Sequence, residues 1–167
     1  MRIAESLIDE LHREEKPTER VLERVPQDKL DWRPHPKSRT IGELAWHVAT
    51  LPQFGTLGLR EGKRELSGAR PPEPTSSDFS NTFRKAVDEM KNVLTGTADD
   101  ALLNEQFSFV LNGNAIRTWS KDVFMRAVVM NHLIHHRGQL TVYLRLLDVP
   151  VPSVYGASAD ENPFVRH

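Results

Sequence analysis

Histidine is the residue type whose positions in this sequence suggest chemistry. The chain has seven histidines and no cysteine. Three of the histidines, at positions 132, 135 and 136, lie in the stretch NHLIHHRGQL, and His47 lies in the apolar stretch ELAWHV. Because imidazole is the commonest protein ligand for divalent transition metals, these two distant segments could form one metal site. The alternative is a core that accommodates imidazole rings.

Helical spacing separates the three clustered histidines. On a helix, His132 and His136 lie one turn apart on an apolar face, with their Cβ atoms about 5–6 Å apart. That spacing suits two ligands of one metal ion. His135 points about 100° away from His136, toward an adjacent apolar strip, and could pair with His132 instead. His47 also lies on the apolar side of its own predicted helix.

Both interpretations of these histidines agree with their spacing. A single histidine on an apolar face is usually a core residue that is hydrogen-bonded to a neighbour. Several desolvated imidazoles, however, are costly unless each has a partner, and a shared cation supplies one for all of them. The zinc-protease motif H-E-x-x-H is excluded, because Leu133 stands where that motif needs its glutamate.

Composition limits the classes of function. Without cysteine the chain has no disulfide, no thiolate ligand and no nucleophilic thiol of its own. The formal net charge is -1, and the basic residues are scattered between acids, so we expect no nucleic-acid partner. No segment approaches the roughly 20 apolar residues that span a bilayer. We therefore expect a cytoplasmic protein with a small-molecule substrate and no membrane association.

Apolar periodicity predicts four long helices in this chain of 167 residues, at 2–24, 40–61, 77–96 and 120–147. Pro17 should kink or split the first helix, and Pro52 should kink the second or end it early. Thr40 and Glu43 fit a capping box that starts the second helix. The fold class that we predict is all-α, a four-helix bundle in one domain that covers residues 1–167.

Three further features qualify this architecture. The alternating segment QFSFVLNGNAIRTW contains Asn112-Gly113 and predicts a small β-hairpin or an extended loop before the last helix. The Pro-rich segment 66–77 predicts a long loop that would permit a crossover between the second and third helices. The last helix is apolar on most sides, which indicates either deep burial within the monomer or a dimer contact.

Three motifs resemble the DinB superfamily, the DinB/YfiT-like metalloenzymes. These motifs are LDWRPHPKSRTIGELAWHVA, NHLIHHRGQL and the closing VPVPSVYG. The resemblance implies a four-helix bundle with up-down-down-up topology, often a homodimer, and a divalent metal ion, commonly nickel or zinc, held by three histidines. Matched residue by residue, those ligands are His47, His132 and His136. His135 occupies the position of an additional histidine that is not normally a ligand.

The resemblance implies an enzyme class without fixing a substrate. Characterised relatives include S-transferases that use bacillithiol or mycothiol, and a mycothiol-dependent maleylpyruvate isomerase. We therefore expect a metal-dependent S-transferase, or a related hydrolase, with a low-molecular-weight thiol as cosubstrate. The alternative is a non-catalytic stress-response protein that binds a metal or a small ligand. No catalytic acid or base stands out; Glu43 lies one turn before His47, but helix capping explains its presence.

Overall fold

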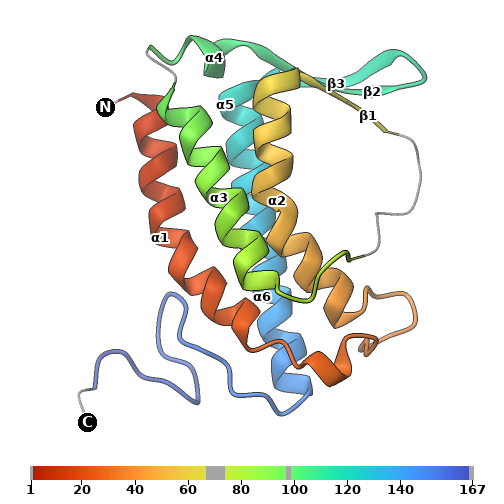
Figure 1. Ribbon diagram of the computed structural model, residues 1–167, viewed down its shortest axis with the longest axis vertical. Helices are drawn as coiled ribbons and strands as arrows, with labels where there is room; N and C mark the ends of the chain where they lie inside the picture. Colours follow the sequence, from red (N-terminus) through yellow and green to blue (C-terminus); the bar gives the residue numbers. More distant parts are fainter. Residues whose placement is uncertain (1, 67–73, 97–98, 166–167) are drawn as a thin grey trace.

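The computed structural model describes residues 2–66, 74–96 and 99–165 of the chain. The molecule is mostly helical and carries a small three-stranded sheet at one end of its helices (Figure 1). The longer helices are α1 (Ile3–Glu23), α2 (Ile41–Glu61), α3 (Phe79–Thr95) and α6 (Asn131–Leu146). The shorter helical elements are η1 (Gln27–Lys29), α4 (Ala101–Asn104), α5 (Lys121–Phe124) and the π-helix η2 (Met125–Met130).

Each longer helix packs against two others. Helix α1 contacts α3 and α6, and α2 also contacts α3 and α6. Helices α1 and α6 run in one direction and α2 and α3 in the opposite one (Figure 1). The buried apolar side chains form two clusters, and the boundary between them crosses the start of α6, because Met130 belongs to one cluster and Leu133 to the other. Within the described residues, no helix is both long and apolar enough to cross a membrane.

The start of α2 confirms the predicted capping box. The Thr40 hydroxyl accepts a hydrogen bond from the Glu43 amide at 3.1 Å, and Glu43 Oε2 accepts one from the Thr40 amide at 2.7 Å. The predicted interruptions by proline are wrong in part, because α1 is not split at Pro17 and α2 does not end early at Pro52. Each proline removes one helical hydrogen bond, but the core-facing side chains before and after it are buried, so packing holds the helix together.

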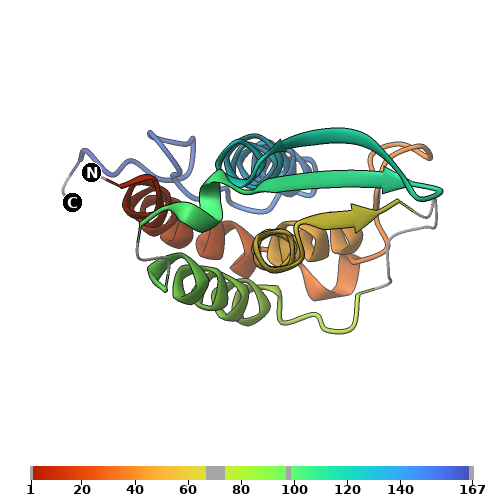
Figure 2. The ribbon, with the colours of Figure 1, turned by 90° about the horizontal axis from the view of Figure 1, so that it is seen from above.

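The predicted hairpin is confirmed, and one further strand joins it. Strands β2 (Gln106–Leu111) and β3 (Asn114–Ser120) are antiparallel, and Asn112 and Gly113 between them both have positive φ, as a tight hairpin turn requires. Strand β1 (Lys63–Glu65) pairs parallel with β2. Figure 2 shows β1 beside the hairpin. The all-α prediction is corrected accordingly: β1 has three charged residues and no apolar alternation, so periodicity could not reveal it.

The Pro-rich segment between α2 and α3 was predicted to be a long loop. Its residues 67–73 lie outside the described residues. Helix α3 begins at Phe79, where Asp78 Oδ1 accepts a hydrogen bond from the Asn81 amide.

The last predicted helix, 120–147, differs from the structure in its middle. Instead of one regular α-helix, the π-helix η2 separates α5 from α6. A helical wheel assumes 3.6 residues per turn throughout, so it cannot detect such a wider segment. This helix is also not deeply buried on most sides, although one of the two interpretations expected deep burial. Val142 and Leu146 are each 57% exposed, whereas the side chain of Arg137 is only 2% exposed.

Arg137 is buried because it has partners on two other segments. Its guanidinium forms an ion pair with Glu14 of α1 at 2.7 Å and donates a hydrogen bond to the Thr18 hydroxyl at 2.9 Å. It also donates to the hydroxyl of Tyr155 at 2.6 Å, and that hydroxyl donates in turn to Glu14 at 2.9 Å. The network therefore joins α1, α6 and the irregular C-terminal segment through one buried cation.

Candidate metal centre

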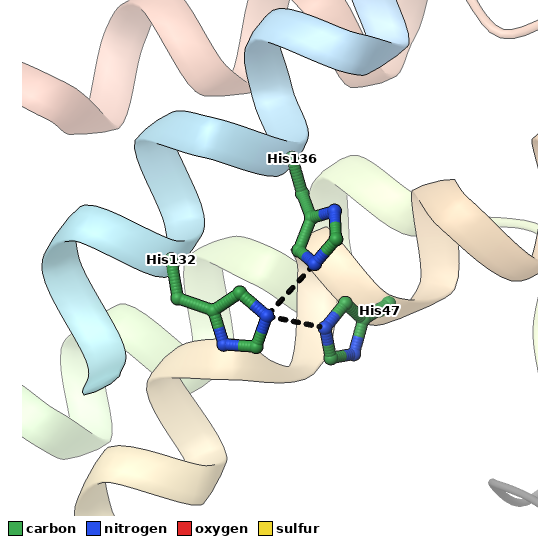
Figure 3. A group of neighbouring side chains, drawn as sticks. All are labelled: His47, His132 and His136. Carbon is green, nitrogen blue, oxygen red and sulfur yellow. Dashed lines mark hydrogen bonds between the residues drawn. The ribbon is translucent and has the colours of Figure 1, made fainter.

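Helices α2 and α6 bring the three predicted histidines together. His47 lies two turns into α2, and His132 and His136 lie one turn apart in α6. Figure 3 shows their rings pointing toward one another across the two helices. His132 Nε2 lies 2.8 Å from His136 Nε2 and 3.3 Å from His47 Nε2. One ring nitrogen from each residue lies within 4.8 Å of the others, so the three form a group that could hold a metal ion.

His135 lies outside this group. Its side chain is exposed, and its ring contacts the His136 ring from the side, with 4.9 Å between the centroids. Adjacent residues on a helix point about 100° apart, so His135 and His136 cannot face the same ion with equal ease. The pairing of His132 with His136 is thereby favoured over the pairing with His135 that the sequence left open.

Hydrogen bonds at the far side of two rings determine where their protons lie. His136 Nδ1 is 2.6 Å from Gln139 Oε1, and because that oxygen can only accept, Nδ1 carries the hydrogen. His132 turns Nε2 toward His136 and hydrogen-bonds the backbone of Val128, an interaction that raises its pKa and therefore involves its Nδ1 as donor. Both neutral rings thus leave Nε2 without a proton.

This arrangement of lone pairs calls for a cation. Two unprotonated Nε2 atoms 2.8 Å apart repel each other unless a positive charge lies between them. In a tetrahedral zinc site with Zn–N bonds of about 2.0–2.1 Å, neighbouring nitrogens lie about 3.3 Å apart. The His47–His132 distance of 3.3 Å already fits this value, and the His132–His136 pair would need to open by about 0.5 Å. The donor set therefore fits a divalent metal ion.

The three imidazoles are neutral at physiological pH. Burial is the main cause that lowers the pKa of His47 to about 3, with smaller contributions from the charge of Arg39 and from the other two histidines. Burial likewise lowers the pKa of His136 to about 4, against the opposing hydrogen bond to Gln139. The pKa of His132 is lowered by burial as well. A metal can therefore bind without first displacing protons from these rings.

The sequence of the chain matches the profile of the DinB family over residues 2–162. The chain belongs to the DinB family. The uncharacterized protein YrdA of Bacillus subtilis is 26% identical over 149 residues, which cover 86% of this chain and 83% of YrdA.

Solved structures of DinB-like proteins share the fold. A DinB-like protein of Bacillus cereus is 26% identical, with a TM-score of 0.68, and the match covers 90% of this chain and 97% of that one. YjoA of Bacillus subtilis, 20% identical, gives a TM-score of 0.68 over 89% of this chain and 96% of that one. The likeness to YjoA supports the fold alone.

The charges around the centre of this DinB-family protein are positive. Among the described residues, Arg39 is the permanently charged group that lowers the pKa of all three rings; neighbouring histidines add to this only when they are protonated, and no carboxylate contributes. Glu43 caps α2 and borders a separate hollow that Asp31 and Phe79 also line. The capping interpretation of Glu43 is therefore the one that the structure supports.

Three residues of this DinB centre were absent from the sequence-based prediction. Gln139 lies three residues after His136, and the helical i, i+3 spacing could have revealed it. The contact of His132 with the backbone of Val128 could not be predicted, because it depends on the path of the helix before His132. The effect of Arg39 could not be predicted either. The position of the Arg39 charge depends on how the loop before α2 folds.

Proposed function

We propose that the protein is a divalent-metal-dependent S-transferase that uses a low-molecular-weight thiol as cosubstrate. The convergence of three neutral imidazole rings, whose pKa values no carboxylate of the described residues raises, carries this proposal. His47, His132 and His136 would hold the ion, and nickel and zinc both accept imidazole ligands. Three neutral ligands leave the ion its full charge and an open position, which favours ionisation of a thiol bound there.

The chain itself would bind, orient and admit the reactants. Its three histidines are half-buried, so their rings are fixed by α2 and α6 while one side of the centre stays open to solvent. Because the protein has no cysteine, the thiol must come from solution. The thiol releases its proton to solvent, its sulfur forms a bond to an electrophilic carbon, and the leaving group departs with the electron pair of the broken bond.

Metal content and thiol consumption together test this function. Purified protein would be loaded with nickel or zinc, assayed by elemental analysis, and then mixed with a thiol and an aromatic halide as electrophile. We expect metal-dependent loss of free thiol in the wild type and in His135→Ala, and none in His136→Ala. Loss of electrophile without thiol would point instead to the related hydrolase.

The same assay also tests the non-catalytic alternative. A protein that binds one metal ion and consumes no thiol with any electrophile supports the non-catalytic alternative, a stress-response protein that binds metal or a small ligand. Failure to bind metal contradicts the S-transferase and the metal-binding form of the alternative, and leaves only a protein that binds a small ligand.

We also propose the up-down-down-up four-helix bundle and a homodimer. The directions of the four longer helices support the first (Figure 1). The second is supported by the exposed apolar side chains of Val142 and Leu146 on α6, which a second copy of the chain could cover.

A further inference from the structure

Arg39 lies in the loop before α2, and its charge acts on all three histidines of the metal centre. It directly precedes Thr40, the N-cap of α2, and its side chain is half-buried. Within 2–66, 74–96 and 99–165, no hydrogen bond or ion pair engages its guanidinium. A partly buried arginine without a partner is costly, because its desolvated charge has nothing to offset it.

The loop that carries Arg39 is fixed against both helices of the centre. The Ile41 amide donates to the Trp32 carbonyl at 2.8 Å, which closes the loop onto the start of α2. The Trp32 ring packs edge-on against Tyr143 of α6, with 5.7 Å between the ring centroids. From Thr40 to His47 the helix rises about 10 Å, a span that the side chains of Arg39 and His47 can bridge together. In agreement, the charge of Arg39 lowers the pKa of all three ligand histidines.

A loaded centre would carry an excess of positive charge. The divalent ion and Arg39 together bring three positive charges, and no carboxylate from the described residues offsets them. A thiolate at the ion contributes only one negative charge. A ligand with a second negative group would offset the charge of Arg39 as well, at the mouth of a half-buried site where such pairing is stronger than in water.

We propose that Arg39 binds a carboxylate group of the thiol cosubstrate, so that the ligand joins the three-histidine centre to this arginine. This inference rests on the proposed function and narrows its substrate class to thiols that carry a carboxylate. The planar guanidinium matches a carboxylate through two parallel hydrogen bonds. A phosphate is less suited, because the capping box of Thr40 and Glu43 already occupies the helix N-terminus that could have helped to hold one.

The test compares two thiols that differ in one charge. Cobalt-loaded protein would be titrated with mercaptobutanoate and with its uncharged analogue mercaptobutanol, and each dissociation constant measured by calorimetry. We expect the wild type to bind the acid at least about tenfold more tightly, as a charge-assisted hydrogen bond allows. In Arg39→Gln this preference should disappear, and Arg39→Lys should keep part of it. Arg33→Gln, in the same loop but lining the separate hollow, is the matched control and should keep the full preference.

The outcomes distinguish a failure of the role of Arg39 from a failure of the proposed S-transferase function. If Arg39→Gln keeps metal, binds mercaptobutanol like the wild type and still prefers the acid, the role of Arg39 is overturned and the metal-thiol function stands. If the loaded wild type binds neither thiol, the proposed function fails and the inference fails with it. If Arg39→Gln does not fold, Arg39→Lys and the salt dependence of binding replace it. The inference is overturned if Arg39→Lys prefers mercaptobutanoate over mercaptobutanol as strongly as the wild type does and if salt does not weaken binding of mercaptobutanoate.

Discussion

His132 Nε2 lies 2.8 Å from His136 Nε2 and 3.3 Å from His47 Nε2, and the centroids of the three rings lie 4.5–4.9 Å apart, so the rings form a compact triangle. The Nε2 atom of His132 lies within hydrogen-bonding distance of both other Nε2 atoms. The far nitrogen of the His132 ring is held by a hydrogen bond to the backbone of Val128. Because this hydrogen bond fixes the His132 ring, its Nε2 already points in one direction before a metal ion binds. The loss of side-chain entropy on metal binding is therefore smaller.

The first prediction concerns the ligands themselves. Replacing His136 by Ala should remove most of the bound metal, because two neutral nitrogens hold a divalent ion far less tightly than three. His135→Ala should leave the stoichiometry near that of the wild type, since its ring lies outside the group. Elemental analysis after dialysis measures both. Unchanged metal content in the Ala variants of His47, His132 and His136 would falsify the metal centre.

Gln139 should tune the affinity without binding the metal. Gln139→Leu removes the acceptor that holds His136 Nδ1–H, and we expect metal affinity to fall about tenfold to hundredfold. Gln139→Glu keeps an acceptor oxygen and should restore most of the affinity. Competition with a chelator measures the affinity, and nitrogen NMR of His136 reports its tautomer. The exposed Asn131→Leu on the same helix is the control; equal affinities in both Leu variants would contradict a positioning role.

Acid should destabilise the metal-free protein in a defined window. The pKa of His136 is lowered to about 4 and that of His47 to about 3, below the ordinary value of 6.5. Between about pH 6.5 and 4 the unfolded chain therefore binds more protons than the folded one, so the free energy of unfolding should fall as pH decreases. Urea unfolding across this range measures the slope. A profile as steep in the His47→Gln, His136→Gln double variant as in the wild type would assign the loss to other groups.

The same lowered pKa values bear on metal release. Imidazoles with ordinary pKa values would lose a metal as the pH drops below about 6. Since His136 titrates only near 4, we expect occupancy to persist below pH 6 and to fall as the pH approaches 4. Metal retention during a pH series, followed by elemental analysis, checks this; complete release by pH 6 contradicts it.

The buried pair of Arg137 and Glu14 should be essential for stability. Glu14→Ala leaves the guanidinium buried without its counter-ion, and we expect a loss of about 3–5 kcal/mol in the free energy of unfolding. Disrupting the exposed pair of Arg145 and Asp160 should have a much smaller effect, because solvent screens it. Urea denaturation compares Glu14→Ala with Arg145→Ala, and similar losses in the two variants would show that burial does not decide the difference.

The assembly prediction depends on two side chains of α6. Val142 and Leu146 are each 57% exposed, one turn apart. If a second copy covers them, wild-type protein should scatter light as a dimer, at about twice the chain mass of 19.0 kDa. The double variant Val142→Asp, Leu146→Asp should then be monomeric and still folded. A wild-type mass near 19.0 kDa at micromolar concentration would exclude this interface.

Much of the helical fold could be predicted from the sequence, because apolar periodicity is a local property. The i, i+4 spacing indicated that His132 and His136 could share a metal, and the resemblance to the DinB superfamily implied the full set with His47. The start of α2 at Thr40 and the turn at Asn112-Gly113 are also encoded by neighbouring residues. The burial of Arg137 and the strand β1 could not be predicted, since each depends on partners far along the chain. An arginine is usually exposed, and only its ion pair with Glu14 on a distant helix explains the burial of Arg137.

A π-helix is an α-helix with one residue added, and η2 occupies the six residues directly before α6. If the same six residues, Met125–Met130, were wound as a regular α-helix, everything upstream would turn by about 100° relative to His132 and His136. Buried Phe124, packed on Phe107 with 3.8 Å between the ring centroids, would then leave its place in the core. The wider turn of η2 absorbs the added residue, so the hairpin end of the molecule packs correctly while the histidines still face α2.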